Sequence, residues 1–110
     1  MKKFKYAIEG LKYALSNKAV RIQIILGVLA IIGGFIIRLD IYEWLAFVIC
    51  IGLVISLEII NCVIEETCDM YNQNFDIRIK HIKDMAAAAV FTASIMALVV
   101  CAICVLRRIF

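Results

Sequence analysis

The sequence predicts an all-α membrane protein, with an N-terminal amphipathic surface helix followed by three transmembrane helices. Of the 110 residues, 65% are hydrophobic and the mean hydropathy is +1.01, well above the range of soluble domains. Three long runs are almost free of charge, and in lipid only helices can satisfy the backbone of such isolated runs. The chain lacks proline and has five glycines, so no linker-like stretch divides it, and we expect a single domain over residues 1–110.

The surface helix is expected over residues 3–16. Apolar residues recur there with helical spacing at Phe4, Ile8, Leu11 and Leu15, and the lysines fall largely on other faces. A helix with one apolar and one basic face favours the membrane interface.

The transmembrane helices are expected over residues 22–37, 44–64 and 85–106. The first run is 16 residues long, short of the roughly 20 that cross a bilayer. Snorkelling of Arg21 and Arg38 at its two ends extends it. The third run is rich in alanine, and small residues favour close packing against other helices and oligomerisation.

The distribution of basic residues predicts the orientation. Nine of the twelve Lys and Arg residues lie on the cytoplasmic side if the N-terminus is cytoplasmic, as the positive-inside rule requires. Arg107 and Arg108 fall on the other side and argue against it. We expect a multi-pass protein of the cell membrane, whose basic N-terminus meets an anionic membrane surface and no nucleic acid.

An acidic strip is predicted on the second transmembrane helix. Glu58, Asn61, Glu65 and Asp69 follow at helical spacing, within a strip about 80° wide. An ionisable residue inside a span indicates a functional site, and four polar groups in register strengthen that interpretation. The alternative is a structural role, in which Glu58 is protonated and hydrogen-bonded or paired with a lysine.

The strip suits phosphoryl transfer to a lipid. Carboxylates near the membrane boundary are suitable ligands for Mg²⁺ bound to nucleotide phosphates. A carboxylate deeper in the membrane could take the proton of a lipid hydroxyl.

A second polar cluster, Lys80, His81, Lys83 and Asp84, precedes the third span. Lys83 could neutralise phosphate charge, with a helix N-terminus expected directly after it. The alternative is that Lys83 and Asp84 are ordinary interfacial residues. The sequence has neither a glycine-rich Walker loop nor a zinc motif.

Two motifs resemble those of the prokaryotic diacylglycerol kinase and undecaprenol kinase family. Residues 56–69, SLEIINCVIEETCD, resemble the signature E-x-x-N-[ST]-A-[IV]-E-x-x-x-D. Fourteen residues past Asp69, residues 83–90, KDMAAAAV, resemble the signature K-D-x-[AG]-[AS]-[AG]-A-V. The resemblance extends to residues 6–11 and 41–44.

The resemblance implies a homotrimer whose active sites are shared between subunits. Carried over by motif, Glu58 is the catalytic base beside the lipid alcohol, and Glu65 is the ligand that holds Mg²⁺ with ATP. Asn61 and Asp69 support the site. The implied nucleotide contacts are Glu65, Lys83, Asp84, Tyr6 and the loop from Asn74 to Asp76.

One position departs from the family pattern. The family has a second metal-binding glutamate before the first span, and the matching position here is Asn17 or Lys18, depending on where one deletion is placed. A lysine would repel Mg²⁺, whereas an asparagine offers a neutral oxygen. Glu9 or Glu66 could substitute for the missing carboxylate.

The first functional hypothesis is therefore an ATP- and Mg²⁺-dependent kinase of a membrane alcohol. Undecaprenol ranks above diacylglycerol, because the Glu43-Trp44 pair and the Ser-Leu-Glu start of the first signature are nearer to the Gram-positive branch. The second hypothesis is a catalytically impaired member that binds nucleotide or lipid or acts as a membrane scaffold. The third is a small transporter or proton-relay subunit that uses Glu58.

Overall fold

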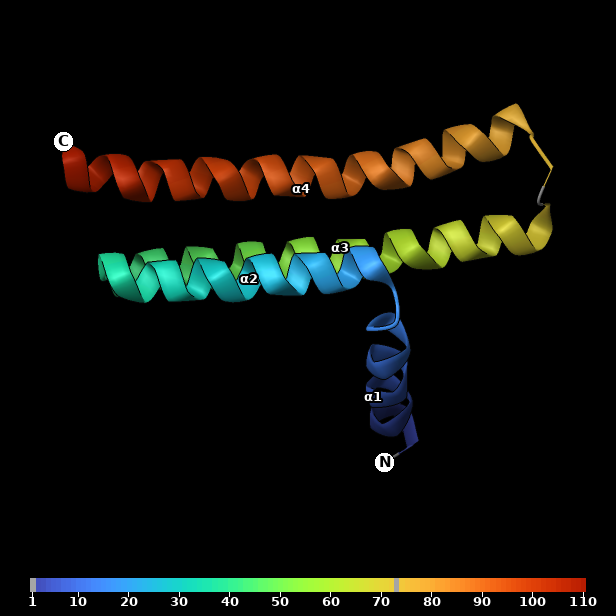
Figure 1. Ribbon diagram of the computed structural model, residues 1–110, viewed down its shortest axis with the longest axis horizontal. Helices are drawn as coiled ribbons and strands as arrows, with labels where there is room; N and C mark the ends of the chain where they lie inside the picture. Colours follow the sequence, from blue (N-terminus) through green and yellow to red (C-terminus); the bar gives the residue numbers. More distant parts are fainter. Residues whose placement is uncertain (1, 73) are drawn as a thin grey trace.

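The computed structural model describes residues 2–72 and 74–110, and their regular structure is helical. The four helices are α1 (Lys2–Ala14), α2 (Lys18–Ile37), α3 (Ile41–Tyr71) and α4 (Ile77–Ile109) (Figure 1). Helices α2, α3 and α4 are each long and apolar enough to cross a membrane. The expected fold class, an all-α membrane protein, is confirmed.

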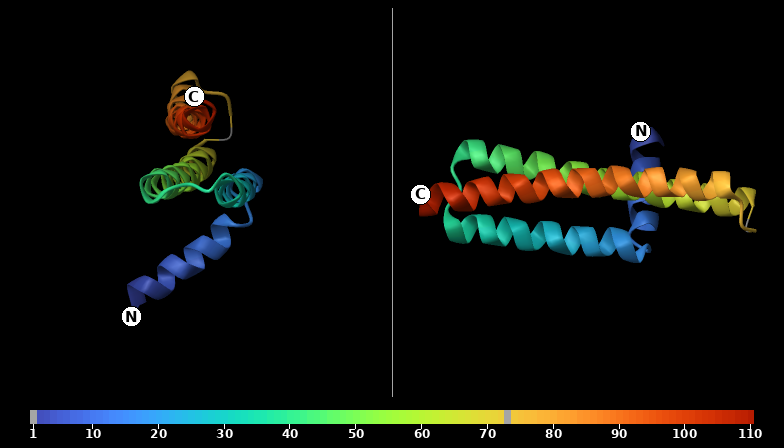
Figure 2. Two further views of the ribbon diagram at one scale, coloured as in Figure 1. Left: turned by 90° about the vertical axis from the view of Figure 1, so that its left-hand side faces the viewer. Right: turned by 90° about the horizontal axis from the view of Figure 1, so that it is seen from above.

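The three long helices form a bundle from which α1 projects sideways. Helices α2, α3 and α4 run side by side, and α1 leaves the bundle where α2 begins (Figure 1). Seen from above, α4 lies over the seam between α2 and α3 (Figure 2). Helices α3 and α4 extend past the start of α2, so one end of the bundle consists of two helices only.

The helices are longer than the uncharged runs that predicted them. Helix α2 begins at Lys18 and has 20 residues, enough for about 30 Å at 1.5 Å per residue. Helix α3 continues to Tyr71 and α4 begins at Ile77. Hydropathy marks the part of a helix that faces lipid, whereas these extensions carry charges and continue outside it.

Glycines let α2 approach its neighbours closely. A Cβ on Gly34 would lie 2.8 Å from the side chains of Leu39 and Trp44, and one on Gly27 would lie 3.0 Å from Ile51. At distances this short, an added side chain would force the neighbouring side chains to shift. The small residues therefore fix the spacing between α2 and α3.

The turn between α2 and α3 is closed by local hydrogen bonds. Arg38 adopts the left-handed conformation with φ of 59°, which ends α2. Asp40 is the N-cap of α3: its Oδ1 accepts a hydrogen bond from the Glu43 backbone N–H at 2.9 Å, and Glu43 accepts one from the Asp40 N–H at 3.1 Å. This reciprocal capping box starts α3 immediately after the turn.

Four charged residues, Asp40, Glu43, Arg107 and Arg108, form what we term the far-end clamp. The Arg108 guanidinium donates to both carboxylate oxygens of Glu43 at 2.6 and 2.8 Å. It also donates to the backbone oxygens of Ile37 and Arg38 at 2.9 and 3.0 Å. One side chain of α4 is thus bonded to the end of α2 and the start of α3.

The clamp also accounts for the two arginines that argued against the orientation. Arg107 lies 3.4 Å from carboxylate oxygens of both Asp40 and Glu43. Both arginines are therefore paired with acids at their own end of the bundle. Their positions reflect helix packing, which the count of basic residues does not consider.

Candidate functional site

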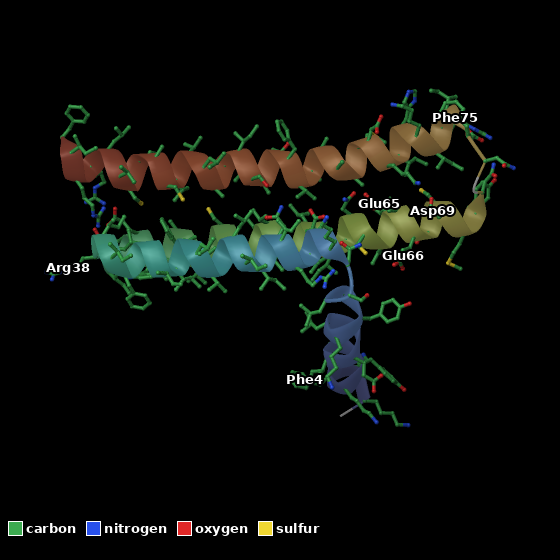
Figure 3. The ribbon with its side chains drawn as sticks, viewed as in Figure 1. Phe4, Arg38, Glu65, Glu66, Asp69 and Phe75 are labelled. Carbon is green, nitrogen blue, oxygen red and sulfur yellow. The ribbon has the colours of Figure 1, made fainter. Side chains whose placement is uncertain are left out.

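The predicted strip lies on the stretch of α3 where the bundle changes from three helices to two. Glu58 and Asn61 are buried, whereas Glu65 and Asp69 are exposed beyond the start of α2. Figure 3 shows Glu65 and Asp69 on the side of α3 that faces α4. The strip therefore connects the interior of the bundle to its two-helix end.

The buried part of the strip has unused hydrogen-bonding capacity. Glu58 is 7% exposed and Asn61 is 8% exposed. The Asn61 Nδ2 donates to Glu65 Oε1 at 3.2 Å, and its Oδ1 has no partner among the described residues. Glu58 forms no ion pair with any of the residues that the structure describes. Buried polar atoms are nearly always bonded, so an unbonded one indicates a place for a ligand or water.

Lys83 joins the strip from the opposite helix. Its Nζ lies 2.6 Å from Asp69 Oδ1, which connects α4 to α3. Asp84 points elsewhere and pairs with Lys80 at 2.7 Å on the exposed face of α4. Of the two neighbouring residues in the second signature, the structure brings only Lys83 to the strip.

The expected helix start after Lys83 is wrong. Asp76 is the N-cap of α4, and Lys83 lies in the second turn of the helix. The free backbone N–H groups of the α4 N-terminus are therefore near Asp76 and not beside Lys83. Lys83 can meet an anion only through its own charge.

Asp76 and Asn74 are held within the loop that precedes α4. Asp76 accepts hydrogen bonds from the backbone N–H of Arg78 at 2.9 Å and from its guanidinium at 3.3 Å. These bonds from Arg78 lower the pKa of Asp76 below its ordinary value. The Asn74 backbone N–H donates to Asn72 Oδ1 at 2.9 Å.

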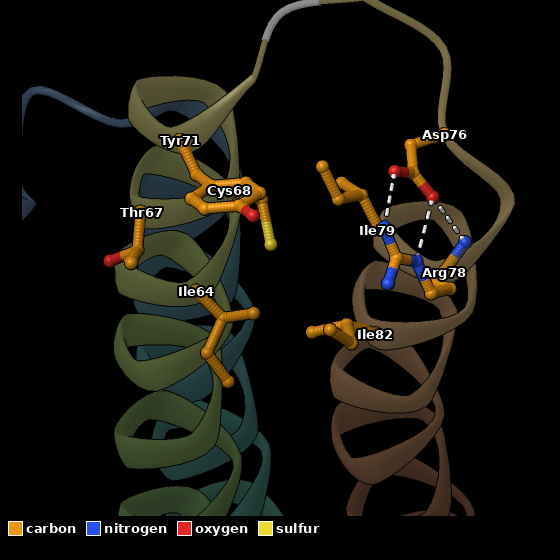
Figure 4. A pocket seen from close by; sticks show the side chains of 8 residues that line it. All are labelled: Ile64, Thr67, Cys68, Tyr71, Asp76, Arg78, Ile79 and Ile82. Carbon is orange, nitrogen blue, oxygen red and sulfur yellow. Dashed lines mark hydrogen bonds and ion pairs between the residues drawn. The ribbon is translucent and has the colours of Figure 1, made fainter.

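A pocket of about 530 Å³ lies beneath this loop, between the ends of α3 and α4 (Figure 4). Its lining is mostly apolar and contains no residue of the strip; it consists of Ile64, Thr67, Cys68, Tyr71, Asp76, Arg78, Ile79 and Ile82. The pocket is thus separate from the polar groups of Glu58, Asn61 and Lys83.

Tyr6 is not brought to the strip. It is 64% exposed on α1, the helix that projects from the bundle. A cleft between α1 and α3 includes Gly10, Asn17, Cys62 and Glu66 but not Tyr6. A role for Tyr6 in nucleotide binding therefore requires movement of α1 or a neighbouring subunit.

Asn17 has a structural role in the fold, whereas the sequence pattern had been interpreted only in terms of a metal ligand at this position. Its Oδ1 accepts a hydrogen bond from the Val20 N–H at 3.2 Å and caps α2, while its Nδ2 donates to Cys62 Sγ at 3.2 Å. Both polar atoms of the side chain are thus used within the fold. Asparagine immediately before a long apolar run is a recognised N-cap signal, so the sequence did contain this information.

The donor set fits a magnesium ion only in part. The described residues contain no group of three or more Asp, Glu, His or Cys side chains able to enclose a metal. Glu65 and the unbonded oxygen of Asn61 lie one helical turn apart. This set suits a Mg²⁺ ion that keeps several waters and is held chiefly by nucleotide phosphates.

Neither proposed substitute for the missing glutamate completes the set. Glu66 points away from Glu65 and lines the cleft toward α1 (Figure 3). Glu9 lies on α1 among Phe4, Ile8 and two lysines. A carboxylate that takes the place of the missing glutamate near Glu65 would therefore have to come from another chain or from a change in conformation.

The fold and the strip together define a helical integral membrane protein with a polar site near one end of its bundle. Residues 5–105 match the family model described as prokaryotic diacylglycerol kinase. The chain belongs to this family. It is also 34% identical over 70 residues to undecaprenol kinase of Bacillus subtilis (strain 168), a match that covers 64% of the chain and 57% of that protein.

Proposed function

We propose that the protein is a bacterial lipid kinase that transfers the γ-phosphoryl group of ATP to the hydroxyl of a membrane alcohol. Family membership supports kinase chemistry. The observation that carries the proposal is the buried pair Glu58 and Asn61, in which the Asn61 Oδ1 has no partner among the described residues and which adjoins an exposed carboxylate at Glu65. A lipid hydroxyl reaches this place from the bilayer, and ATP reaches it from water.

Glu58 is the proposed general base. It lies within α3, about 10 Å along the helix axis below Glu65, so it can meet a hydroxyl that stays within the membrane. In the proposed step Glu58 accepts the hydroxyl proton, the alcohol oxygen forms a bond to the γ-phosphorus, and the bond to the ADP oxygen breaks. Asn61 orients the alcohol or the phosphate through its free oxygen.

Glu65 and Lys83 are the proposed nucleotide contacts. Glu65 would hold the Mg²⁺ ion that accompanies ATP, and this ion supplies charge neutralisation at the phosphates when bound. Lys83 now pairs with Asp69, and its ammonium can turn from that carboxylate to a phosphate of the nucleotide. Asp84, Tyr6, Asn74 and Asp76 are outer contacts, carried over from the family motifs.

Undecaprenol is the favoured alcohol over diacylglycerol, and the protein acts as a homotrimer with a cytoplasmic N-terminus. The similarity to the Bacillus undecaprenol kinase supports the ranking of substrates. The six basic residues from Lys2 to Arg21 support the orientation. The projecting α1 and the incomplete set of acids at Glu65 support an active site completed by a second subunit.

The test is transfer of labelled phosphate from ATP to undecaprenol or diacylglycerol in mixed micelles. Wild-type protein should phosphorylate undecaprenol faster, and EDTA or Glu65→Gln should remove the activity. Asn17→Glu and Lys18→Glu, made separately, reveal whether an added carboxylate increases the rate. A wild type with no product on either lipid, in the presence of Mg²⁺, would refute the proposal.

The second candidate is a family member that binds nucleotide or lipid without turnover. The observation in its favour is Asn17, whose side-chain atoms are both committed to the fold where the family has a metal ligand. A binding assay with a non-hydrolysable ATP analogue distinguishes this case, because the analogue would bind although no phospholipid forms.

A further inference from the structure

Ion pairs join α4 to α3 at both ends of the bundle. At the two-helix end, Lys83 Nζ lies 2.6 Å from Asp69 Oδ1. At the far-end clamp, a guanidinium nitrogen of Arg108 lies 2.6 Å from Glu43 Oε1. The Glu43 side chain is 5% exposed, whereas the side chains of Asp69 and Lys83 are 58% and 35% exposed. The two pairs are equally short, but only the Lys83–Asp69 pair is open to water.

The two cations also differ in the number of their partners. Arg108 donates to Glu43 and to three backbone oxygens. For Lys83, the described part of the chain provides one acceptor, Asp69 Oδ1. An exposed pair of this kind contributes little to stability. If Lys83 leaves, water solvates Asp69, so no buried charge is left without a partner. The pair can therefore open easily, whereas the clamp cannot.

The pair lies where the nucleotide is proposed to bind. Asp69 follows Glu65 by one helical turn, about 6 Å along the axis of α3. Both carboxylates are on the side of α3 that faces α4, the helix that carries Lys83 (Figure 3). The lysine ammonium stands at the end of a flexible four-carbon stem. It can therefore turn from Asp69 toward a phosphate that is held beside Glu65.

A nucleotide phosphate and Asp69 would require the same cation. Both are anionic acceptors for the N–H groups of Lys83, and charged hydrogen bonds of this kind are the strong ones. A nucleotide can bind Lys83 only in molecules whose Lys83–Asp69 pair has opened. The apparent affinity is reduced by the fraction of molecules in that state. Asp69 thus opposes nucleotide binding, which differs from a supporting role.

From these observations we propose that Asp69 competes with the nucleotide phosphates for Lys83, so that the pair weakens nucleotide binding and promotes the release of ADP. The inference rests on the proposed function, in which Lys83 contacts the nucleotide. Asp69 acts through Lys83 and does not touch the reacting atoms, so it is a positioning residue. In the empty site it holds the ammonium, and after the reaction it takes the ammonium back.

The test measures the dissociation constant of a non-hydrolysable ATP analogue, with Mg²⁺, for the full-length wild type and Asp69→Asn. Salt is kept at about 0.15 M, where the Debye length is about 8 Å and distant charges are screened. Asp69→Asn should bind the analogue more tightly, by up to about fivefold, which corresponds to the strength of an exposed ion pair. A residue that only supported the site would change affinity in the opposite direction.

Three further variants separate competition from a general effect of charge. Glu66→Gln removes a negative charge from the same part of α3, but Glu66 lines the cleft toward α1, so the affinity should stay that of wild type. Asp69→Glu keeps the competing carboxylate and should also bind as wild type does. In a Lys83→Met background, Asp69→Asn should have no effect, because the cation is absent.

Steady-state kinetics with undecaprenol provides a second readout. In Asp69→Asn, KM for ATP should fall by a similar factor without a rise in kcat, as expected for an effect on binding alone. Weaker or unchanged binding in Asp69→Asn would refute the competition and leave the kinase proposal intact. Tighter binding that persists in the Lys83→Met background would refute it as well. If none of the proteins bound the analogue or turned over, the proposed function would fail together with this inference.

Discussion

Two glutamates of α3, Glu43 and Glu58, are almost equally buried but have opposite surroundings. Glu43 is 5% exposed and Glu58 is 7% exposed. Glu43 accepts two hydrogen bonds from Arg108 and one from the Asp40 backbone, whereas Glu58 has no ion pair among the residues that the structure describes. Its neighbour Asn61 carries an unbonded oxygen.

This difference separates a structural carboxylate from a candidate reactive one. A buried charge that stabilises a fold is paired, and its hydrogen bonds are complete. A group that receives a substrate must retain an unused atom until the substrate arrives. The burial of Glu43 and Glu58 alone would have assigned the same role to both carboxylates. Their hydrogen-bond and ion-pair partners distinguish them.

The largest effect expected from the remaining variants is at Lys83. Lys83→Ala removes a charged hydrogen-bond donor from the nucleotide phosphates, so KM for ATP should rise by about 10- to 100-fold. Lys80→Ala is the matched control, because Lys80 pairs with Asp84 on the exposed face. Steady-state kinetics over a range of ATP concentrations measures both. Equal KM values for the two variants would contradict the assignment of Lys83 to the site.

A large effect of another kind is expected at the far-end clamp. Arg108→Gln leaves Glu43 buried without its cation and removes the partner of the Ile37 and Arg38 backbone oxygens at the end of α2, so the thermal midpoint should fall clearly. Arg107→Gln removes only pairs at 3.4 Å and should change the midpoint little. Thermal unfolding in one detergent compares them. A similar shift in both variants would show that Arg108 is not the central residue of the clamp.

A smaller effect is expected at Asn17. Asn17→Ala should destabilise the protein by about 1 kcal/mol because α2 loses its cap. Asn17→Asp keeps the capping oxygen but cannot donate to Cys62, so its stability should lie between those of wild type and the alanine variant. Chemical unfolding at a pH well above the aspartate pKa measures both. An alanine variant as stable as wild type would contradict the capping role.

The smallest effect is expected from Asp76 at acid pH. Its pKa is lowered below 3.8 by hydrogen bonds from Arg78, so its contribution to stability is present above that pH and is lost as the pH falls through the folded-state pKa. Asp76→Asn keeps a capping side chain but does not titrate. The difference in stability between the two proteins should therefore change below about pH 4. Parallel acid titration curves would contradict this.

Much of the fold was evident from the sequence because its signals are local. The charge-free runs predicted the three spans, and the helical spacing of Glu58, Asn61, Glu65 and Asp69 predicted one strip. That spacing also implied that α3 continues to Asp69, beyond the apolar run, whereas the N-terminal extension of α4 was missed because charged helical residues outside lipid leave no hydropathy signal. For the same reason the helix was expected to begin directly after Lys83, whereas α4 begins at Ile77. Lys83 therefore does not lie beside the free N–H groups of a helix N-terminus.

The contacts between distant residues could not be derived from the sequence. Arg108 meets Glu43 at a separation of 65 positions along the chain, and Asn17 meets Cys62 at a separation of 45. Such pairs depend on how the helices pack, which spacing along one helix does not reveal. The Asp40 capping box and the Asn17 cap are different, because both are local motifs that a search for helix starts would have found.

The most direct test of the contrast between the two glutamates uses Glu58→Gln and Glu43→Gln, each measured for undecaprenol phosphorylation and for thermal midpoint. Glu58→Gln should lose about 10²- to 10⁴-fold in kcat, the typical contribution of a general base, with a midpoint near that of wild type. Glu43→Gln should keep most of its kcat at a temperature where it is folded, with a clearly lower midpoint. Loss of kcat in Glu43→Gln but not in Glu58→Gln would contradict the assignment of the reactive end of the bundle.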